Sequence, residues 1–206
     1  MPEASTEKVK KPTPAAIERL SEIKAAAAKC FYDRGYHGTD LRFIAAEAGM
    51  HPSSFYNYIK SKQELLYLIM MDGLDEMNRG LDEAIREAPD PVAALRLAIQ
   101  FQVNVTANSR FNAWTQQVEV RSLTGEFRET VISERDKYQR KWVSIVRGGI
   151  KSGQFRKVDA KLAVIGMLSM AQVSRWYSPG GDAKPEAIAE LFADMVISGL
   201  AAPAAR

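Results

Sequence analysis

The segment from residue 39 to residue 62 constrains the fold more than any other part of the chain. Its first half carries apolar side chains at helical spacing, Gly49 can supply a left-handed turn, and Pro52 stands where a second helix can begin. Phe55 and Ile59 are four residues apart and therefore share one face, which we expect to point inward. The pattern predicts a helix-turn-helix: two short helices joined by a tight turn.

The polar residues of this segment favour nucleic acid as its partner. We expect Thr39 to cap the first helix. No acidic residue occurs between Glu47 and Glu64, so a phosphate backbone can approach without meeting like charge. The rest of the second helix carries hydrogen-bonding side chains short enough to enter a DNA groove. They are Ser53, Ser54, Tyr56, Asn57 and Tyr58.

The composition is that of an ordinary folded protein. Of 206 residues, 46% are apolar and 26% are charged, which excludes disorder for most of the chain. Cys30 is the only cysteine and falls in an apolar helical pattern, so we interpret it as a core residue rather than a redox sensor. The sequence shows no signal peptide and no membrane span, and we expect a cytoplasmic protein.

Helical periodicity runs through the rest of the chain, without an alternating strand pattern of useful length. Thr13 and Pro14 start a first helix that Gly35 ends, and Ser61 with Glu64 forms a capping box for a long helix reaching about residue 88. Further helices are expected over residues 91–107, 110–122, 126–152, 159–177 and 184–200. We predict an all-α fold of about nine helices.

Four short motifs between residues 17 and 66 occur in a fixed order and spacing. They are a helix ending in Phe31 through Gly35-Tyr36, the run from Ile44 to Gly49, the run from Phe55 to Ile59, and the run from Ser61 to Leu66. Each is common alone, whereas the ordered set is specific. In this set the chain resembles the TetR family of bacterial regulators. Residues 50–53, Met-His-Pro-Ser, depart from the family pattern and are expected to alter contacts but not the fold.

We expect three parts, the first from its polar composition and the other two, with their partners, from the resemblance. These are a disordered basic arm over residues 1–12, a helix-turn-helix DNA-binding domain over 13–60, and a helical ligand-binding and dimerisation domain over 61–206. The arm is either a plain disordered terminus or a source of non-specific phosphate contacts. The expected partners are double-stranded operator DNA, a hydrophobic small-molecule effector and a second copy joined through the last two helices. No cofactor and no membrane is expected.

The resemblance also implies roles for single residues. Arg42, Ser53, Ser54 and Asn57 would reach bases or nearby phosphates. Tyr56, Tyr58 and Lys62 would bind the DNA backbone through their hydroxyl and ammonium groups. Tyr56 has a plain alternative, a packing ring with its hydroxyl outward. The predicted DNA-contacting set is Thr39, Arg42, His51, Ser53, Ser54, Tyr56, Asn57, Tyr58 and Lys62.

The carboxy-terminal part resembles a narrower group. Residues 136–142, 149–156 and especially Arg175-Trp176-Tyr177-Ser178-Pro179-Gly180-Gly181 are similar to TetR regulators that repress fatty-acid and sterol-ring degradation and leave DNA on binding an acyl-CoA. The chemistry allows such an effector, because residues 109–157 hold 11 basic and 5 acidic side chains. Candidates for its phosphates are Arg121, Arg135, Arg140, Lys141 and Arg147.

The apolar part of an acyl-CoA needs a cavity between helices. Candidates for its lining are Phe101, Val105, Phe111, Trp114, Val118, Val146, Met167, Met170 and Val173. The predicted ligand-binding set is Trp114, Glu119, Arg121, Arg140, Arg147, Met167, Met170, Arg175 and Trp176. The plain alternatives are a solvated basic face, a packed core, and a dimer seam shaped by residues 175–177.

Two other functions remain open on the sequence. Within the family, the chain could regulate an efflux pump and respond to a neutral or cationic hydrophobic ligand. Outside it, the chain could be a helical enzyme or lipid carrier. Against an enzyme, the sequence has no metal-ligand cluster or phosphate loop, and its only histidines, His37 and His51, lie near the helix-turn-helix.

Overall fold

The computed structural model describes residues 13–108, 110–173, 176–178 and 180–202, without the side chains of residues 110 and 114. Within these residues the chain forms nine α-helices and one 3-10 turn, η1, and the all-α prediction is confirmed. The predicted arm over residues 1–12 lies outside the described residues. The elements are α1 (Pro14–Arg34), α2 (Leu41–Glu47), α3 (Pro52–Phe55), α4 (Lys62–Ile85), α5 (Pro91–Asn108), α6 (Arg110–Val118), η1 (Glu119–Ser122), α7 (Gly125–Lys151), α8 (Ala160–Met170) and α9 (Pro185–Leu200).

Local capping signals explain where the amino-terminal helices begin. The Thr13 side chain accepts from the backbone of residue 16 and caps α1 as predicted. The Ser61 side chain accepts from the backbone N–H of Glu64 and caps α4, also as predicted. Gly49 has φ 64°, the left-handed value that the turn between α2 and α3 requires. The predicted cap of α2 is wrong, because Asp40, not Thr39, accepts from the backbone of Phe43.

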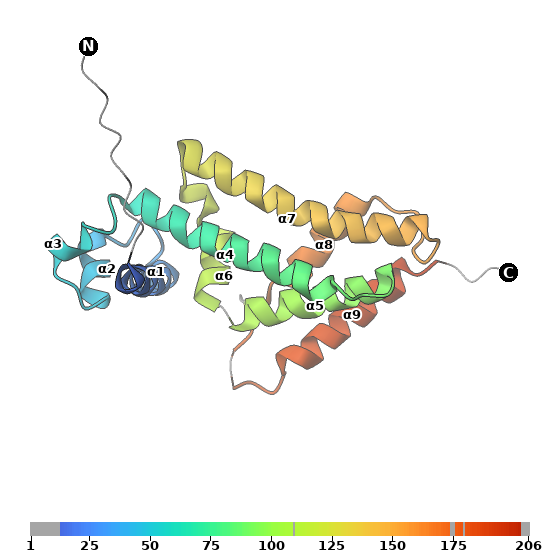
Figure 1. Ribbon diagram of the computed structural model, residues 1–206. Coiled ribbons are helices and arrows are strands. Elements are labelled where there is room, and N and C mark those ends of the chain that lie inside the picture. The colour runs from blue at the N-terminus through green and yellow to red at the C-terminus, as the bar shows by residue number, and fades with distance from the viewer. Residues whose placement is uncertain (1–12, 109, 174–175, 179, 203–206) are drawn as a thin grey trace, which may run out of the picture.

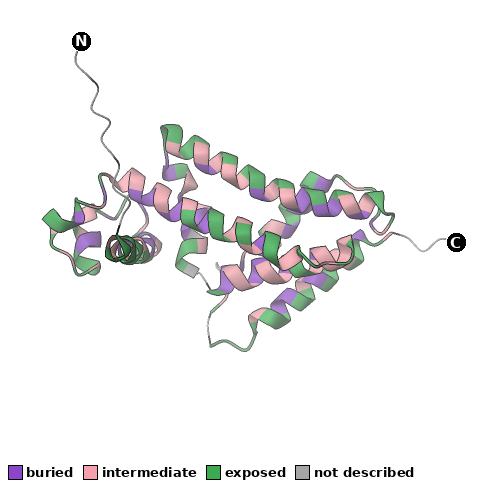
Figure 2. Ribbon diagram, in the orientation of Figure 1, coloured by how far each residue is buried: buried purple, intermediate pink, exposed green. Residues whose placement is uncertain are grey.

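Helix α4 connects two hydrophobic cores. Figure 1 shows α1, α2 and α3 at one end of an elongated molecule, with α4 running from that end into the body formed by α5 to α9. The amino-terminal core contains Phe31, Ile44, Phe55 and Ile59 together with the first half of α4. Leu81, near the end of α4, belongs to the carboxy-terminal core instead. Buried residues therefore line α4 along most of its length (Figure 2).

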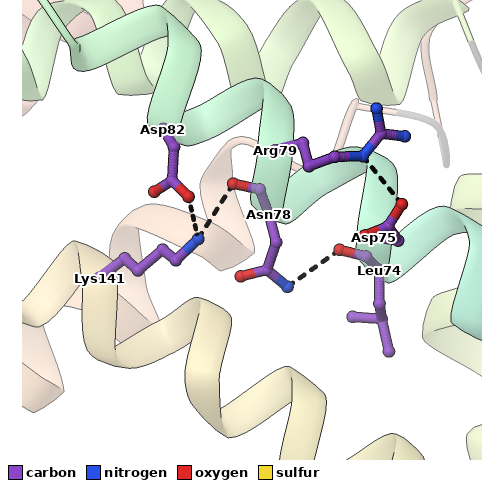
Figure 3. A network of polar contacts seen from close by, with 6 residues as sticks. All are labelled: Leu74, Asp75, Asn78, Arg79, Asp82 and Lys141. Carbon is purple, nitrogen blue, oxygen red and sulfur yellow. Dashed lines mark hydrogen bonds and ion pairs between the residues drawn. The ribbon is translucent and has the colours of Figure 1, made fainter.

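Polar contacts fasten the body helices to one another. Lys141 on α7 donates to the Asn78 carbonyl at 3.0 Å and to the Asp82 carboxylate at 2.6 Å, both on α4 (Figure 3). Arg96 on α5 donates to the carboxylates of Glu190 and Asp194 on α9, at 3.2 and 2.8 Å. These bonds connect α4 to α7 and α5 to α9.

Helix α8 ends earlier than the sequence indicates. The predicted span was 159–177, whereas α8 ends at Met170. The carbonyl of Ala171 accepts a hydrogen bond from the Thr106 hydroxyl of α5 at 2.9 Å. The chain just after α8 is thus hydrogen-bonded to α5. Within the described residues, no helix is long and apolar enough to cross a membrane.

Candidate functional site

The exposed face of α2 and α3 carries most of the predicted DNA-contacting side chains. Arg42 on α2 and Ser53 and Ser54 on α3 are exposed, and so is Asn57 just after α3. Tyr56 is 49% exposed, which leaves its ring and hydroxyl available to a partner. Phe55 and Ile59 are fully buried beneath them, as their spacing predicts. The arrangement presents short hydrogen-bonding groups on a fixed surface, as readout of base edges requires.

His51 and Tyr58 also have structural roles at this surface. The Nδ1 of His51 accepts from the backbone N–H of Ser53 and lies 2.9 Å from the Ser53 hydroxyl, so His51 caps α3. Tyr58 is half-buried and packs against the amino-terminal core. Both remain predicted DNA contacts, with these structural roles added.

Thr39 faces the interior rather than the surface. Its side chain is only 2% exposed, and its hydroxyl lies 2.9 Å from the Gly35 carbonyl and 3.2 Å from the Cys30 carbonyl. A hydroxyl has one proton to donate, and here it goes to the end of α1. The side chain of Thr39 therefore joins α1 to the start of α2 and lies away from the surface that Ser53 and Asn57 form.

Lys62 braces the same region from α4. Its ammonium donates to the Tyr36 and Thr39 carbonyls, both at 2.8 Å, and lies 4.3 Å from the centre of the Tyr36 ring. Two of its three N–H donors are thus used within the protein. Burial raises the pKa of the Tyr36 hydroxyl, which accepts a bond from Gln63 at 2.8 Å.

The η1 turn contacts this amino-terminal end through a buried carboxylate. Glu119 is 5% exposed and accepts from the backbone N–H of Tyr36 at 3.1 Å and from the Ser122 hydroxyl at 2.8 Å. Gln63 on α4 donates to the Ser122 carbonyl at 2.6 Å and accepts from the backbone N–H of Thr124 at 3.1 Å. These bonds join η1 to both the end of α1 and the start of α4.

A cavity of about 300 Å³ lies between α4, α5, α6, α7 and α8. Its wall is more polar than apolar in residue type, and amide side chains predominate. Glu76, Asn112 and Asp136 are exposed residues of this lining, and the remainder lie deeper. The other lining residues are Gly73, Leu74, Met77, Gln102, Val105, Thr106, Ala113, Gln116, Gln117, Arg135, Tyr138, Gln139, Leu168 and Gln172.

Arg135 and Gln116 form the polar end of this cavity. The Nη1 of Arg135 donates to the main-chain carbonyl of Gln116 at 3.1 Å, and burial lowers the pKa of the guanidinium. The Nε2 of Gln116 donates to the Met70 carbonyl of α4 at 2.5 Å. Burial raises the pKa of Tyr138, whose hydroxyl donates to the Oε1 of Gln102 at 2.5 Å.

Two family models match this chain, one over the region that contains α2 and α3 and one over most of the carboxy-terminal part. The model for bacterial regulatory proteins of the tetR family matches residues 23–67, which include α2 and α3. The model for the tetracyclin repressor-like carboxy-terminal domain matches residues 88–200, more than half of the chain. The chain belongs to the TetR family. This family consists of DNA-binding transcriptional regulators, not enzymes.

TetR-family relatives match nearly the whole chain. The HTH-type transcriptional repressor KstR2 of Rhodococcus jostii (strain RHA1) is 30% identical over 188 residues, 90% of this chain and 92% of that protein. A tetR-family regulatory protein from Rhodococcus RHA1 matches with a TM-score of 0.84 at 26% identity, covering 90% of this chain and 98% of that one. AibR, in complex with isovaleryl coenzyme A and operator DNA, matches with a TM-score of 0.80 at 27% identity over 86% and 97% of the two chains.

The predicted ligand-binding residues of this TetR-family chain lie away from the cavity lining, as far as they are described. Arg175 and the side chain of Trp114 lie outside the described residues. Met167 is buried in the carboxy-terminal core, and Trp176 is 56% exposed. Glu119 is bonded to Tyr36, as above. The others are half-buried or exposed: Met170, Arg121, Arg140 and Arg147. Their role in binding stays a prediction.

Two other sequence candidates do line the cavity, and the amides were missed. Arg135 was a candidate for phosphates and Val105 for the apolar lining, and both contribute to the wall. The amides gave one signal: Gln102 stands beside Val103 and three residues after Ile99, on a buried stripe of α5. A polar residue on such a stripe indicates either a buried hydrogen bond or a ligand site.

Proposed function

We propose that this TetR-family chain is a homodimeric repressor that leaves its operator when an acyl-CoA occupies the cavity, and that it controls genes of lipid or sterol degradation. The observation that carries the proposal is the continuity of α6 and η1. Gln116 lines the cavity, and Glu119, three residues later, bonds the backbone of Tyr36 beside the helix-turn-helix. A ligand that moves α6 therefore acts directly on the support of the DNA-contacting helices.

The size of the cavity supports an acyl group as its occupant. At roughly 30 Å³ per water molecule, its volume of about 300 Å³ is that of about ten waters, a space on the scale of a short acyl chain. The nucleotide part of the coenzyme lies outside in this proposal, because Glu76 and Asp136 at the exposed lining repel phosphates. Arg140 is exposed on α7 directly after Gln139 of the lining and supplies a cation on the outer surface.

The second part of the proposal is the dimer through α8 and α9. Leu162 and Ile165 on α8 and Leu191 and Met195 on α9 are large apolar residues with exposed side chains. Exposed apolar side chains gathered on helix faces mark protein interaction sites. A two-fold dimer of this kind pairs two helix-turn-helix units, which must lie about 35 Å apart to enter successive major grooves. The division at residue 60 into DNA-binding and ligand-binding parts belongs to the same proposal.

A mobility-shift titration tests the effector. An operator is first selected from random duplex DNA with the full-length protein. Octanoyl-CoA and ring-bearing acyl-CoAs are then added to the complex, with coenzyme A alone and octanoate as controls. The proposal expects at least one thioester to release DNA at concentrations where coenzyme A alone does not. Unchanged operator affinity across the whole panel would defeat it.

The acidic lining favours one alternative within the family. Glu76 and Asp136 are exposed residues of the cavity wall, and two carboxylates attract a cation. In that case the chain regulates an efflux pump and responds to a cationic hydrophobic compound. Release of the operator by a cationic dye such as rhodamine 6G, but by no thioester, is the outcome that favours this alternative.

A further inference from the structure

The polar groups of the cavity wall divide into those bonded within the protein and those that are not. The Oε1 of Gln102 accepts from Tyr138, and the hydroxyl of Thr106 lies within hydrogen-bond distance of the Gln102, Val103 and Ala171 carbonyls. The amide oxygens of Gln116 and Gln117, in contrast, are buried and have no hydrogen-bond partner within the described protein. A buried acceptor without a donor is costly, by about 1–3 kcal/mol in typical proteins.

The orientation of Gln116 is fixed by its neighbours. Its side chain lies over Gly73, and its Nε2 lies 2.5 Å from the Met70 carbonyl and 3.4 Å from the Ile69 carbonyl. Carbonyl oxygens only accept, so the amide must present nitrogen to α4 and keep its oxygen for another donor. Gln116 is 9% exposed, which leaves the cavity as the side from which a donor can come.

Arg135 supplies the complementary group. It donates once, to the Gln116 carbonyl, and forms no ion pair with any described carboxylate. A guanidinium has five N–H donors, so most of those of Arg135 are available to an acceptor in the cavity. Because the group is largely buried, an oxygen acceptor there gains a charge-assisted bond.

We infer that the cavity selects an oxygenated ligand, whose carbonyl or carboxylate accepts from Arg135 and whose hydroxyl lies beside the amide oxygens of Gln116 and Gln117 and donates to one of them, over an unsubstituted alkyl acid of the same length. This inference rests on the proposal that the cavity is the effector site. A plain alkyl chain would cover these amides without bonding them. A hydroxyl on the ligand donates a hydrogen bond to one of these amide oxygens. One such bond corresponds to about tenfold in affinity.

The test uses a matched pair of free acids, 3-hydroxyoctanoate and octanoate, titrated into the full-length protein by calorimetry without DNA. Both carry a carboxylate for Arg135, and they differ only in the hydroxyl. We expect 3-hydroxyoctanoate to bind about tenfold more tightly. Equal affinity for the two acids overturns the inference.

Three variants assign the effect to residues. Gln117→Met keeps the side-chain volume and removes the acceptor, and we expect the preference for the hydroxy acid to fall at least threefold. Arg135→Met is expected to weaken both acids by a similar factor. Lys137→Met is the control, because Lys137 is exposed on the same helix and pairs with Glu134. Full retention of the preference in Gln117→Met counts against the inference, and thermal unfolding confirms that each variant is folded.

The titrations separate this inference from the proposed function. Release of the operator by no thioester, together with tighter binding of the hydroxy acid, defeats the acyl-CoA proposal and supports the inference. Release by alkyl and hydroxyalkyl thioesters at equal concentrations, with equal binding of the free acids, supports the acyl-CoA proposal and defeats the inference.

Discussion

A few buried or half-buried polar side chains form hydrogen bonds to main-chain groups around the helix-turn-helix. Thr39 and Lys62 both satisfy main-chain carbonyls where α1 meets α2, and Glu119 satisfies the backbone N–H of Tyr36. An unsatisfied buried main-chain group is costly, so these side chains fix the position of α2 and α3. The sequence gives no sign of this, since threonine and lysine in a DNA-binding motif are typical phosphate contacts.

Substitution of Lys62 tests whether this residue stabilises the fold through the Tyr36 and Thr39 carbonyls or contacts a DNA phosphate. We expect Lys62→Met to lower the free energy of unfolding by about 2 kcal/mol, because two carbonyls lose a charged donor. We expect the salt dependence of operator binding to keep its slope. Urea unfolding followed by circular dichroism and mobility shifts at several salt concentrations measure the two quantities. A slope reduced by about one, with unchanged stability, would instead identify Lys62 as a phosphate contact.

At the scale of helices, the contact between α4 and α6 depends on a missing side chain. A Cβ added at Gly73 would overlap the Nε2 of Gln116, which could then no longer reach the Ile69 and Met70 carbonyls. Glycine in a helix ordinarily costs about 1 kcal/mol relative to alanine. Here close approach of two helices outweighs that cost.

Alanine substitution at two helical glycines checks this point. We expect Gly73→Ala to destabilise the protein by about 1–3 kcal/mol, because Gln116 must move. Gly148→Ala on α7 is the control: an added Cβ lies 3.7 Å from Pro91, an ordinary contact, and we expect a gain of up to about 1 kcal/mol. Chemical denaturation of both variants measures the change in the free energy of unfolding. A stabilised Gly73→Ala would show that Gln116 repacks freely.

Most helix bounds were predictable because their signals are local, while the end of α8 and the cavity residues were not. Thr13 and Ser61 cap α1 and α4 through bonds within one turn, which a short window of sequence contains. Asp40 and Thr39 are both competent caps, and only the burial of Thr39 under the end of α1 separates them. The end of α8 at Met170 has no comparable local signal, and the predicted span continues to residue 177.

The residues that line the cavity are even harder to predict from local sequence. Its amides come from α5, α6, α7 and the segment after α8, and the sequence of one helix does not indicate which turn of another helix will face it. The predicted set relied on aromatic, methionine and arginine residues. In the structure, Met167 instead packs in the carboxy-terminal core, and Arg121 and Arg147 are exposed.

At the scale of the whole molecule, the exposed apolar residues of α8 and α9 bear on the proposed dimer. Leu191 is 57% exposed and Met195 56% exposed, one turn apart on α9. Two such side chains on one helix face are consistent with a symmetric pairing of two chains.

We expect Leu191→Glu to convert the dimer to a monomer and to weaken operator binding, because a charge would be buried at the seam. Leu97→Glu is the control, since Leu97 is also exposed, at 36%, but lies on α5. Size-exclusion chromatography with light scattering gives the mass. An unchanged mass for Leu191→Glu would place the dimer interface elsewhere.

The length of α4 sets a mechanical scale for the molecule. Its 24 residues are packed in one core at the start and in another near the end, and a helix of that length is about 36 Å long. A rigid rod of this length converts a tilt of about 5° at one end into a displacement of about 3 Å at the other. Hydrogen bonds break over smaller distances than this. In the proposed mechanism, a tilt of a few degrees near Leu81 is therefore enough to shift Lys62 and the helices it supports.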